Sequence, residues 1–292
     1  MSFNIYVARL FAGVKTLQKI NFDIQPVFVA MERLKDLQNS PVDDYGSAED
    51  SLDISNTSVK MDKVYFSYDE QEVLQGLDLA IYEKGFYSIV GENGSGKTTI
   101  FKILMGFYKS DSGEISIFSQ NYNNLSTNCI RNHFTYIEKE TFFIHDTIFE
   151  NIRLYNEKSL EEVEEACRKV GLLDFIQQLP NKFETMLEPD TTLFSSGMKQ
   201  KFNFARAIIH PAPIMLFDEI TSDLDGNSEK SLVNTLKELG KKSVVISVSH
   251  RIHAVQSSDK IFVLDQGRIV DEGKWDYLIE NCALVKTLFK NI

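Results

Sequence analysis

Long hydrophobic runs without charge are missing from this sequence of 292 residues. No such run reaches the ~18–20 apolar residues that a transmembrane helix needs. Arg9 and Lys15 interrupt the early apolar stretch, which argues against a secretory signal there. The sequence therefore predicts no membrane-spanning helix within these residues.

Clustered basic residues and paired cysteines are also missing. The net charge is −11, and no group of lysines and arginines offers the positive surface that nucleic-acid phosphates require, so we expect no nucleic-acid partner. Cys129, Cys167 and Cys282 lie far apart and form no CxxC or CxxH pattern. This spacing favours free, buried thiols in a reducing compartment.

A glycine-rich stretch, by contrast, has the pattern G-x-x-x-x-G-K-[ST] between an apolar, strand-like run and a helical pattern. Its glycines allow consecutive backbone N–H groups to point into one anion-binding concavity, which the helix N-terminus makes more positive. Lys97 can reach the β- and γ-phosphates of a nucleotide, and the Thr98 hydroxyl can bind Mg²⁺. The predicted nucleotide-binding residues here are Gly91, Glu92, Asn93, Gly94, Ser95, Gly96, Lys97, Thr98 and Thr99.

Polar groups end two later apolar runs. Residues 214–217 are typical of a strand buried on both faces, and Asp218 and Glu219 follow directly. Because ligands of α/β sheets bind at the carboxyl ends of strands, Asp218 is placed to hold Mg²⁺ through water and Glu219 to polarise an attacking water. His250 ends the run 244–249 and is a candidate contact for a γ-phosphate.

The first 57 residues differ from the rest. Apolar residues recur at spacings of three and four over residues 3–38, which predicts a long amphipathic helix that Pro26 kinks. This helix could fold onto the following domain, pair with a second copy, or be the end of a longer helix whose upstream part is missing. Residues 39–57 are polar, acidic and small, and we expect a linker.

Strand and helix patterns alternate from residue 58 onward. Ser159 and Glu162 form a capping-box pattern, and Gly171 is a natural stop for the helix between them. The strand patterns cover residues 59–68, 73–81, 86–90, 114–118, 133–137, 214–217, 243–248 and 261–264, and the helical patterns cover 99–104, 159–170, 196–209 and 228–239. This alternation predicts an α/β fold with a mainly parallel sheet.

Taken together, these motifs resemble the nucleotide-binding domain of ATP-binding cassette (ABC) transporters over about residues 57–290. The glycine-rich loop corresponds to the Walker A motif, and residues 214–219 correspond to Walker B with the catalytic glutamate. Further matches are Tyr68 where the family stacks an aromatic ring on adenine, residues 194–200 at the signature motif, residues 222–225 at the D-loop, and His250 at the switch histidine. All six motifs agree with the family in order and spacing.

The resemblance implies a P-loop NTPase of ABC type, in which a mainly parallel sheet is joined by an antiparallel β portion and a helical subdomain. The ATPase domain would cover residues 58–292, and the helical subdomain about 138–212. The implied cofactors are ATP and Mg²⁺. The residues assigned by the resemblance are Glu219, His250 and Lys97 for catalysis, and Thr98 and Asp218 for the metal.

A second ABC ATPase domain is implied as a partner, because ATP in this family lies between Walker A of one domain and the signature of the other. Ser195 and Gly197 would contact the nucleotide from the signature side. The stretch from Gln25 to Leu37 resembles the cytoplasmic end of the last membrane helix of ABC exporters. Residues 1–38 would then belong to a transmembrane domain that is otherwise missing from the chain, and the ATPase would power export at the cytoplasmic face of the cell membrane.

Two motifs depart from the family pattern. Ungapped alignment places Lys139 at the Q-loop position, where the family has a glutamine that senses the γ-phosphate and Mg²⁺, although a one-residue slip would place Glu138 or Glu140 there. In the signature, Ser196 replaces a glycine and Met198 a glutamine. These departures keep three alternatives open: half of a heterodimeric exporter with one degenerate site, a homodimer, or a regulatory cassette with low turnover.

Overall fold

The computed structural model describes residues 2–39 and 58–290. The chain divides into two compact units, Met1–Asp44 and Tyr45–Ile292, each of which is described by itself. Of the predicted linker 39–57, Asn39 is the last residue of a helix, and residues 40–57 lie outside the described part of the chain.

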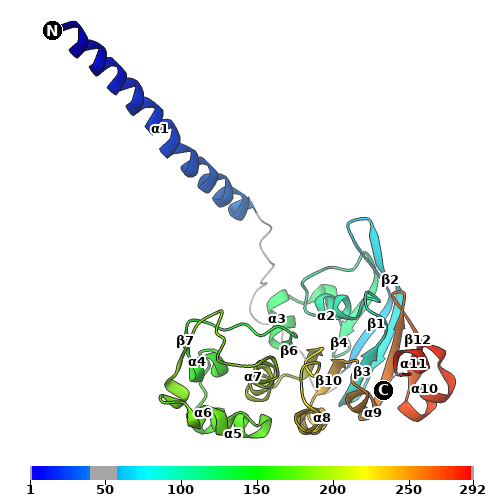
Figure 1. The fold of residues 1–292 in the computed structure, drawn as a ribbon. Helices are drawn as coiled ribbons and strands as arrows, with labels where there is room; N and C mark the ends of the chain where they lie inside the picture. Colours follow the sequence, from blue (N-terminus) through cyan, green and yellow to red (C-terminus); the bar gives the residue numbers. More distant parts are fainter. Residues whose placement is uncertain (1, 40–57, 291–292) are drawn as a thin grey trace. The chain divides into compact units, whose positions relative to one another are not determined.

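The first unit is built around one helix, α1 (Ser2–Asn39), which continues through Pro26 (Figure 1). Pro26 therefore does not end the predicted helix. Phe3, Phe22 and Leu37 are each more than 70% exposed and lie on different sides of the helix, so its apolar surface is wider than a narrow stripe. Among the described residues, no helix has both the length and the apolar character that a membrane span requires.

The second unit contains a six-stranded sheet with the order β12-β11-β3-β10-β9-β6. The five strands from β11 to β6 run parallel, and β12 adds an antiparallel strand at one edge. The strands are β3 (Gly85–Val90), β6 (Phe134–Ile137), β9 (Ile214–Asp218), β10 (Val244–Val248), β11 (Lys260–Asp265) and β12 (Arg268–Gly273). This confirms the predicted α/β fold with a mainly parallel sheet.

An antiparallel sheet forms a second layer of the same unit, with the order β2-β1-β4-β5. Helix α2 (Lys97–Leu104) shares one hydrophobic core with strands of both sheets, because Ile100, Phe101, Ile103 and Leu104 are fully buried there. The strands of this layer are β1 (Val59–Tyr68), β2 (Gln71–Ile81), β4 (Ser112–Ile117) and β5 (Gln120–Asn121). The helix that carries the phosphate-binding loop is thus packed firmly into the fold.

The apolar run of β9 is explained by burial on both faces. Ile214 and Leu216 belong to the core around α2, whereas Met215 and Phe217 belong to a second core on the opposite face. Successive side chains of a strand point to opposite faces, so an unbroken apolar run is required when both faces are covered. Asp218 is the first polar side chain of this strand and stands at its carboxyl end.

The second core is formed largely by elements that lie between β6 and β9 in the sequence. Its elements are β7 (Asp146–Thr147), α4 (Ile148–Arg153), α5 (Leu160–Val170), α6 (Leu173–Gln178), β8 (Met186–Leu187) and α7 (Ser196–Ile209). The capping box of α5 is present as predicted, with Ser159 and Glu162 bonded reciprocally, and Gly171 ends the helix in the left-handed conformation.

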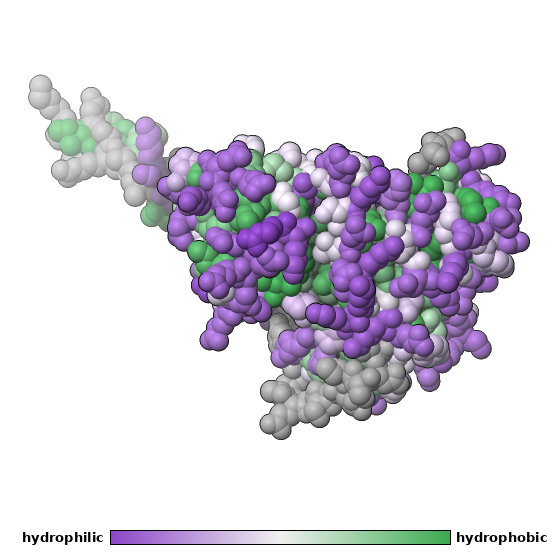
Figure 2. Space-filling view, turned by 90° about the horizontal axis from the view of Figure 1, so that it is seen from below, coloured by the Kyte–Doolittle hydropathy of each residue, from purple (hydrophilic) through white to green (hydrophobic). Residues whose placement is uncertain are grey.

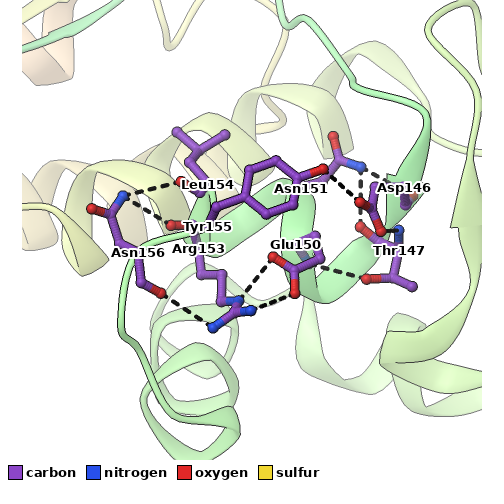
Figure 3. A network of polar contacts seen from close by, with 8 residues as sticks. All are labelled: Asp146, Thr147, Glu150, Asn151, Arg153, Leu154, Tyr155 and Asn156. Atoms are coloured by element: carbon purple, nitrogen blue, oxygen red, sulfur yellow. Dashed lines mark hydrogen bonds and ion pairs between the residues drawn. The ribbon is translucent and has the colours of Figure 1, made fainter.

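Helix α4 is held by a compact polar network (Figure 3). The Thr147 hydroxyl accepts a hydrogen bond from Glu150 N at 3.1 Å and so caps the helix. Arg153 pairs with Glu150 at 2.6 Å, and Tyr155 donates to Asp146 at 2.5 Å. These bonds fix a turn in which Tyr155 has positive φ.

The remaining helices of the described part of the second unit surround the main sheet (Figure 1). They are α3 (Thr127–Asn132), α8 (Gly226–Gly240), α9 (Ile252–Gln256), α10 (Trp275–Asn281) and α11 (Ala283–Leu288), with 3₁₀ turns at Tyr122–Asn124 and Lys182–Glu184. The face of the molecule in the space-filling view is mostly hydrophilic, with small hydrophobic areas between charged residues (Figure 2). Such a surface agrees with the 25% of charged residues in the chain.

Candidate functional site

The glycine-rich loop connects β3 to α2, and its glycines are required by close backbone contacts. A Cβ atom added to Gly91 would lie 2.2 Å from the carbonyl oxygen of Leu264. Gly94 and Gly96 have φ values of +82° and +105°, a region that other residues rarely occupy. The loop therefore adopts the turned-back conformation that the pattern predicted.

Lys97 lies beneath this loop and is only 6% exposed. Its Nζ donates to the carbonyl oxygens of Gly91 at 2.9 Å and Glu92 at 2.7 Å. Burial lowers the pKa of Lys97, while the negative charges of Glu219 and Asp218 oppose this shift. The Ser95 hydroxyl is buried without a hydrogen-bond partner. A buried ammonium and an unused hydroxyl in one loop fit a phosphate group.

A hydroxyl and a carboxylate meet beside the loop. Thr98 Oγ1 donates to Asp218 Oδ2 at 2.7 Å, although the two residues are far apart in sequence. Burial raises the pKa of Asp218, and the hydrogen bond from Thr98 opposes this shift. Among the described residues, no group of three His, Cys, Asp or Glu side chains could hold a metal by itself. The pair instead fits Mg²⁺, which commonly takes one or two protein oxygens together with phosphate and water.

Glu219 follows Asp218 with a φ of +52°, so its side chain leaves the strand direction. Its Oε1 lies 3.3 Å from His250 Nε2, and its Oε2 lies 3.9 Å from Lys139 Nζ. Burial lowers the pKa of His250, and the positive charge of Lys97 acts in the same direction. A neutral His250 can therefore orient the Glu219 carboxylate at neutral pH.

Tyr68 lies at the end of β1 and contacts the helix of the P-loop. Its hydroxyl lies 3.5 Å from Thr99 Oγ1. The rings of Phe66 and Tyr108 meet the Tyr68 ring nearly edge-on, with centroids 4.8 Å and 5.1 Å away. This aromatic group leaves Tyr68 beside the phosphate loop, where an adenine ring could reach it.

The residues predicted to form the signature motif lie at the start of α7. Ser195 is the N-cap, and its hydroxyl accepts a hydrogen bond from Met198 N at 3.3 Å. A Cβ atom added to Gly197 would lie 3.1 Å from the carbonyl oxygen of Asp223, so the D-loop packs closely against α7. Ser196 is exposed at the start of the helix.

Two residues that connect these motifs were not assigned a role from sequence. Gln200 donates to Ser222 Oγ at 3.1 Å and accepts from Asp223 N at 3.2 Å, so it holds the D-loop against α7. Arg251 donates to Ser222 O at 2.5 Å and to Leu224 O at 3.2 Å. The sequence signal that could have pointed to Arg251 was its position directly after His250.

The structure thus brings Lys97, Thr98, Asp218, Glu219 and His250 to one edge of the parallel sheet, at the carboxyl ends of β3, β9 and β10. Lys139 reaches the same group through Glu219.

A strand–loop–helix with a buried lysine, together with an aspartate and a glutamate at the end of a neighbouring parallel strand, defines a P-loop nucleotide-binding protein. Comparison with known families is more specific: the model of the family described as ABC transporter matches residues 74–222. The chain belongs to the ABC transporter family. The predictions of this family and of its fold are confirmed.

Known relatives are similar over almost the whole chain. The chain is 33% identical to the Lactococcin-G-processing and transport ATP-binding protein LagD of Lactococcus lactis subsp. lactis, over 99% of the chain and 41% of that protein. It is 32% identical to an ATP-dependent lipid A-core flippase of Francisella tularensis subsp. tularensis, over 99% of the chain and 48% of that protein.

Among solved structures, a bacterial Atm1-family ABC exporter with ATP bound matches with a TM-score of 0.83 and 29% identity. The match covers 98% of the chain and 51% of the exporter chain. The chain therefore spans about half the length of this exporter, and somewhat less of the two relatives compared above.

Proposed function

We propose that the chain binds Mg-ATP at its Walker A loop and hydrolyses it to power export across a membrane. The observation that carries this proposal is the contact between Thr98 Oγ1 and Asp218 Oδ2 at 2.7 Å, beside the buried Lys97. In this assignment Lys97 binds the β- and γ-phosphates, and the Thr98 and Asp218 oxygens hold Mg²⁺. Mg²⁺ would neutralise the charge of the phosphate oxygens.

Hydrolysis is assigned to Glu219 and His250. Glu219 polarises the attacking water, and His250, 3.3 Å from the Glu219 carboxylate, orients it and contacts the γ-phosphate. Tyr68 stacks on adenine. The backbone of the loop from Gly91 to Thr99 surrounds the phosphates. This division of roles agrees with phosphoryl-transfer enzymes, in which positioning and charge stabilisation supply most of the catalysis.

We infer a second ATPase domain as partner, which is supported by the position of Ser195 and Gly197 at the start of α7, outside the P-loop. In the proposed dimer they contact ATP bound to the Walker A loop of the partner. Helix α1 supports a connection to a transmembrane domain, since it exposes many apolar side chains and the relatives are about twice as long as the chain. We place the ATPase at the cytoplasmic face of the cell membrane.

The first experiment measures Mg-ATP turnover of the full chain beside the Glu219→Gln variant, with dimerisation followed by light scattering. We expect Glu219→Gln to lower kcat by about 100-fold or more while ATP binding persists, because general-base catalysis contributes about 10²–10⁴-fold. An equal turnover in both proteins would remove Glu219 from its proposed role. Loss of activity when Mg²⁺ is chelated tests the metal assignment.

A heterodimer with one degenerate site is the second candidate. It is favoured by the side chain of Ser196 at the exposed start of α7, where the family has a glycine that allows close approach to phosphate. If Ser196 limits a homodimer, Ser196→Gly will raise turnover of the chain alone. If turnover stays low while ATP still binds, a partner chain with its own signature is required. The names of the compared relatives, a transport protein, a flippase and an exporter, favour export over a purely regulatory cassette.

A further inference from the structure

Lys139 lies on a segment whose backbone is held by the signature helix. On one side of it, Asn203 Nδ2 donates to Glu138 O at 3.2 Å, and on the other side, Arg206 Nη1 donates to Phe142 O at 2.9 Å. Both donors are on α7 and are at most 4% exposed. The backbone around Lys139 is therefore fixed to α7.

The far end of this segment is fixed as well. Asn151 is completely buried, and its side chain accepts from Ile144 N and donates to Ile144 O, both at 2.9 Å. Arg206 Nε donates in turn to Asn151 O at 2.8 Å. Asn151 belongs to the network around α4, where its amide also meets Thr147 O (Figure 3). These hydrogen bonds link the segment that carries Lys139 to both α7 and α4.

The side chain of Lys139 lies close to Glu219. Lys139 Nζ lies 3.9 Å from Glu219 Oε2, while His250 Nε2 lies 3.3 Å from Glu219 Oε1. Both carboxylate oxygens thus have a nitrogen neighbour. A water that is to be polarised by Glu219 has to share an oxygen with one of these nitrogens or displace Lys139.

We propose that Lys139 is a positioning residue that restrains Glu219, and that its release is coupled to movement of α7. This inference rests on the proposed role of Glu219 in polarising water. A cation 3.9 Å from a carboxylate oxygen attracts the carboxylate and takes up space beside it that a water could use. Because α7 also carries Ser195 and Gly197, contact of these residues with a nucleotide of the partner would shift Lys139 relative to Glu219.

The effect of Lys139 on Glu219 is expected to be modest. The Lys139 and Glu219 side chains are 51% and 30% exposed, and water competes strongly for ion pairs of this kind. Removing the cation should therefore raise kcat by about two- to fivefold, and the KM for ATP should stay nearly constant. A residue with a merely structural role would not produce this separation of kcat from KM.

The test compares the full chain with Lys139→Met and Lys139→Gln, which remove the charge, and with Lys139→Arg, which retains it. The matched control is Lys158→Met. Lys158 also pairs with a glutamate, since its Nζ lies 3.3 Å from Glu162 Oε1, but Glu162 is on α5 and is not one of the proposed site residues. We expect a higher kcat for Lys139→Met and Lys139→Gln only. In a Glu219→Gln background, the same two substitutions should not raise kcat.

An unchanged or lower kcat in Lys139→Met would overturn the inference, and a lower value would show that Lys139 assists turnover. If the wild type and Lys139→Met both bind ATP but neither turns it over, Lys139 is not the restraint and the inference also fails. Failure of the wild type to bind ATP would instead contradict the proposed function. Thermal unfolding of each variant identifies any loss of fold.

Discussion

Single glycine positions decide whether the nucleotide loop can form. Gly91 has no room for a side chain, since a Cβ atom would lie 2.2 Å from Leu264 O. We expect Gly91→Ala to weaken ATP binding by more than about tenfold, because the loop must move away from β11 to relieve the contact. Equilibrium titration of the wild type and of Gly91→Ala with ATP measures this loss of affinity.

A matched glycine at another helix start gives the control. A Cβ atom on Gly226, the first residue of α8, meets nothing within 4 Å. Gly226→Ala should leave ATP affinity and the unfolding midpoint close to those of the wild type. Equal affinities in the two variants would contradict the steric argument for Gly91.

Burial also determines the chemistry of the cysteines. The Cys167 side chain is fully buried, and desolvation raises the pKa of its thiol to about 12. The thiolate is the reactive form, so we expect Cys167 to remain unmodified by a thiol reagent at pH 8 in the folded chain. Titration with such a reagent should reach all three cysteines only after unfolding. Rapid labelling of Cys167 in the native chain would contradict this expectation.

The Walker residues could be predicted from sequence because each motif combines local spacing with one side-chain chemistry. The contact between Lys139 and Glu219, and the ties of Gln200 and Arg251 to the D-loop, could not be predicted in this way. They join residues from separate elements, and only the packed fold sets those distances. The sequence identified Lys139 as a departure from the family pattern at the Q-loop, but it did not predict that Lys139 lies close to Glu219.

Single elements differ in how clearly the sequence predicts them. Helix α5 begins and ends at capping residues, α7 has a long helical pattern that begins after the N-cap Ser195, and β9 is an unbroken apolar run, so all three were found. The short helices α3, α4, α6, α9, α10 and α11 were missed, because a helix of so few residues is stabilised by its neighbours rather than by its own pattern. The edge strand β12 was also missed, since its residues are partly exposed and polar.

The cap of α5 permits a test of one element. Ser159→Ala removes the acceptor for Glu162 N and should destabilise the ATPase unit by about 1 kcal/mol in chemical unfolding at pH 7. Hydrogen bonding to Ser159 N and to Lys158 lowers the pKa of Glu162. This depressed pKa means that the Glu162 contribution is present above its unfolded pKa of about 4.3 and is lost as the pH falls through the folded value.

The destabilisation caused by Glu162→Gln should accordingly shrink as the pH is lowered below about 4. Lys241→Met, which removes an exposed pair with Glu238 on α8, serves as a surface control with little effect. A constant difference between wild type and Glu162→Gln across this range would contradict the cap assignment.

The whole molecule consists of two compact units, and only the second carries the Walker residues. ATP at about 100 times its dissociation constant should stabilise that unit by about 2.7 kcal/mol, which corresponds to a rise of roughly 5–10 °C in its unfolding midpoint. Calorimetry of the full chain with and without Mg-ATP measures this shift. Gly91→Ala, by weakening ATP binding about tenfold or more, should reduce the shift to about half or less while retaining a cooperative transition.

Three side chains at steps of three residues along α7 give this helix a further property. Gln200 holds the D-loop, Asn203 holds Glu138 O, and Arg206 holds Phe142 O. The D-loop and the segment that carries Lys139 are therefore both held by the same helix. A displacement of α7 would therefore act on both loops, and in the proposed dimer the two ATP sites would respond together rather than independently.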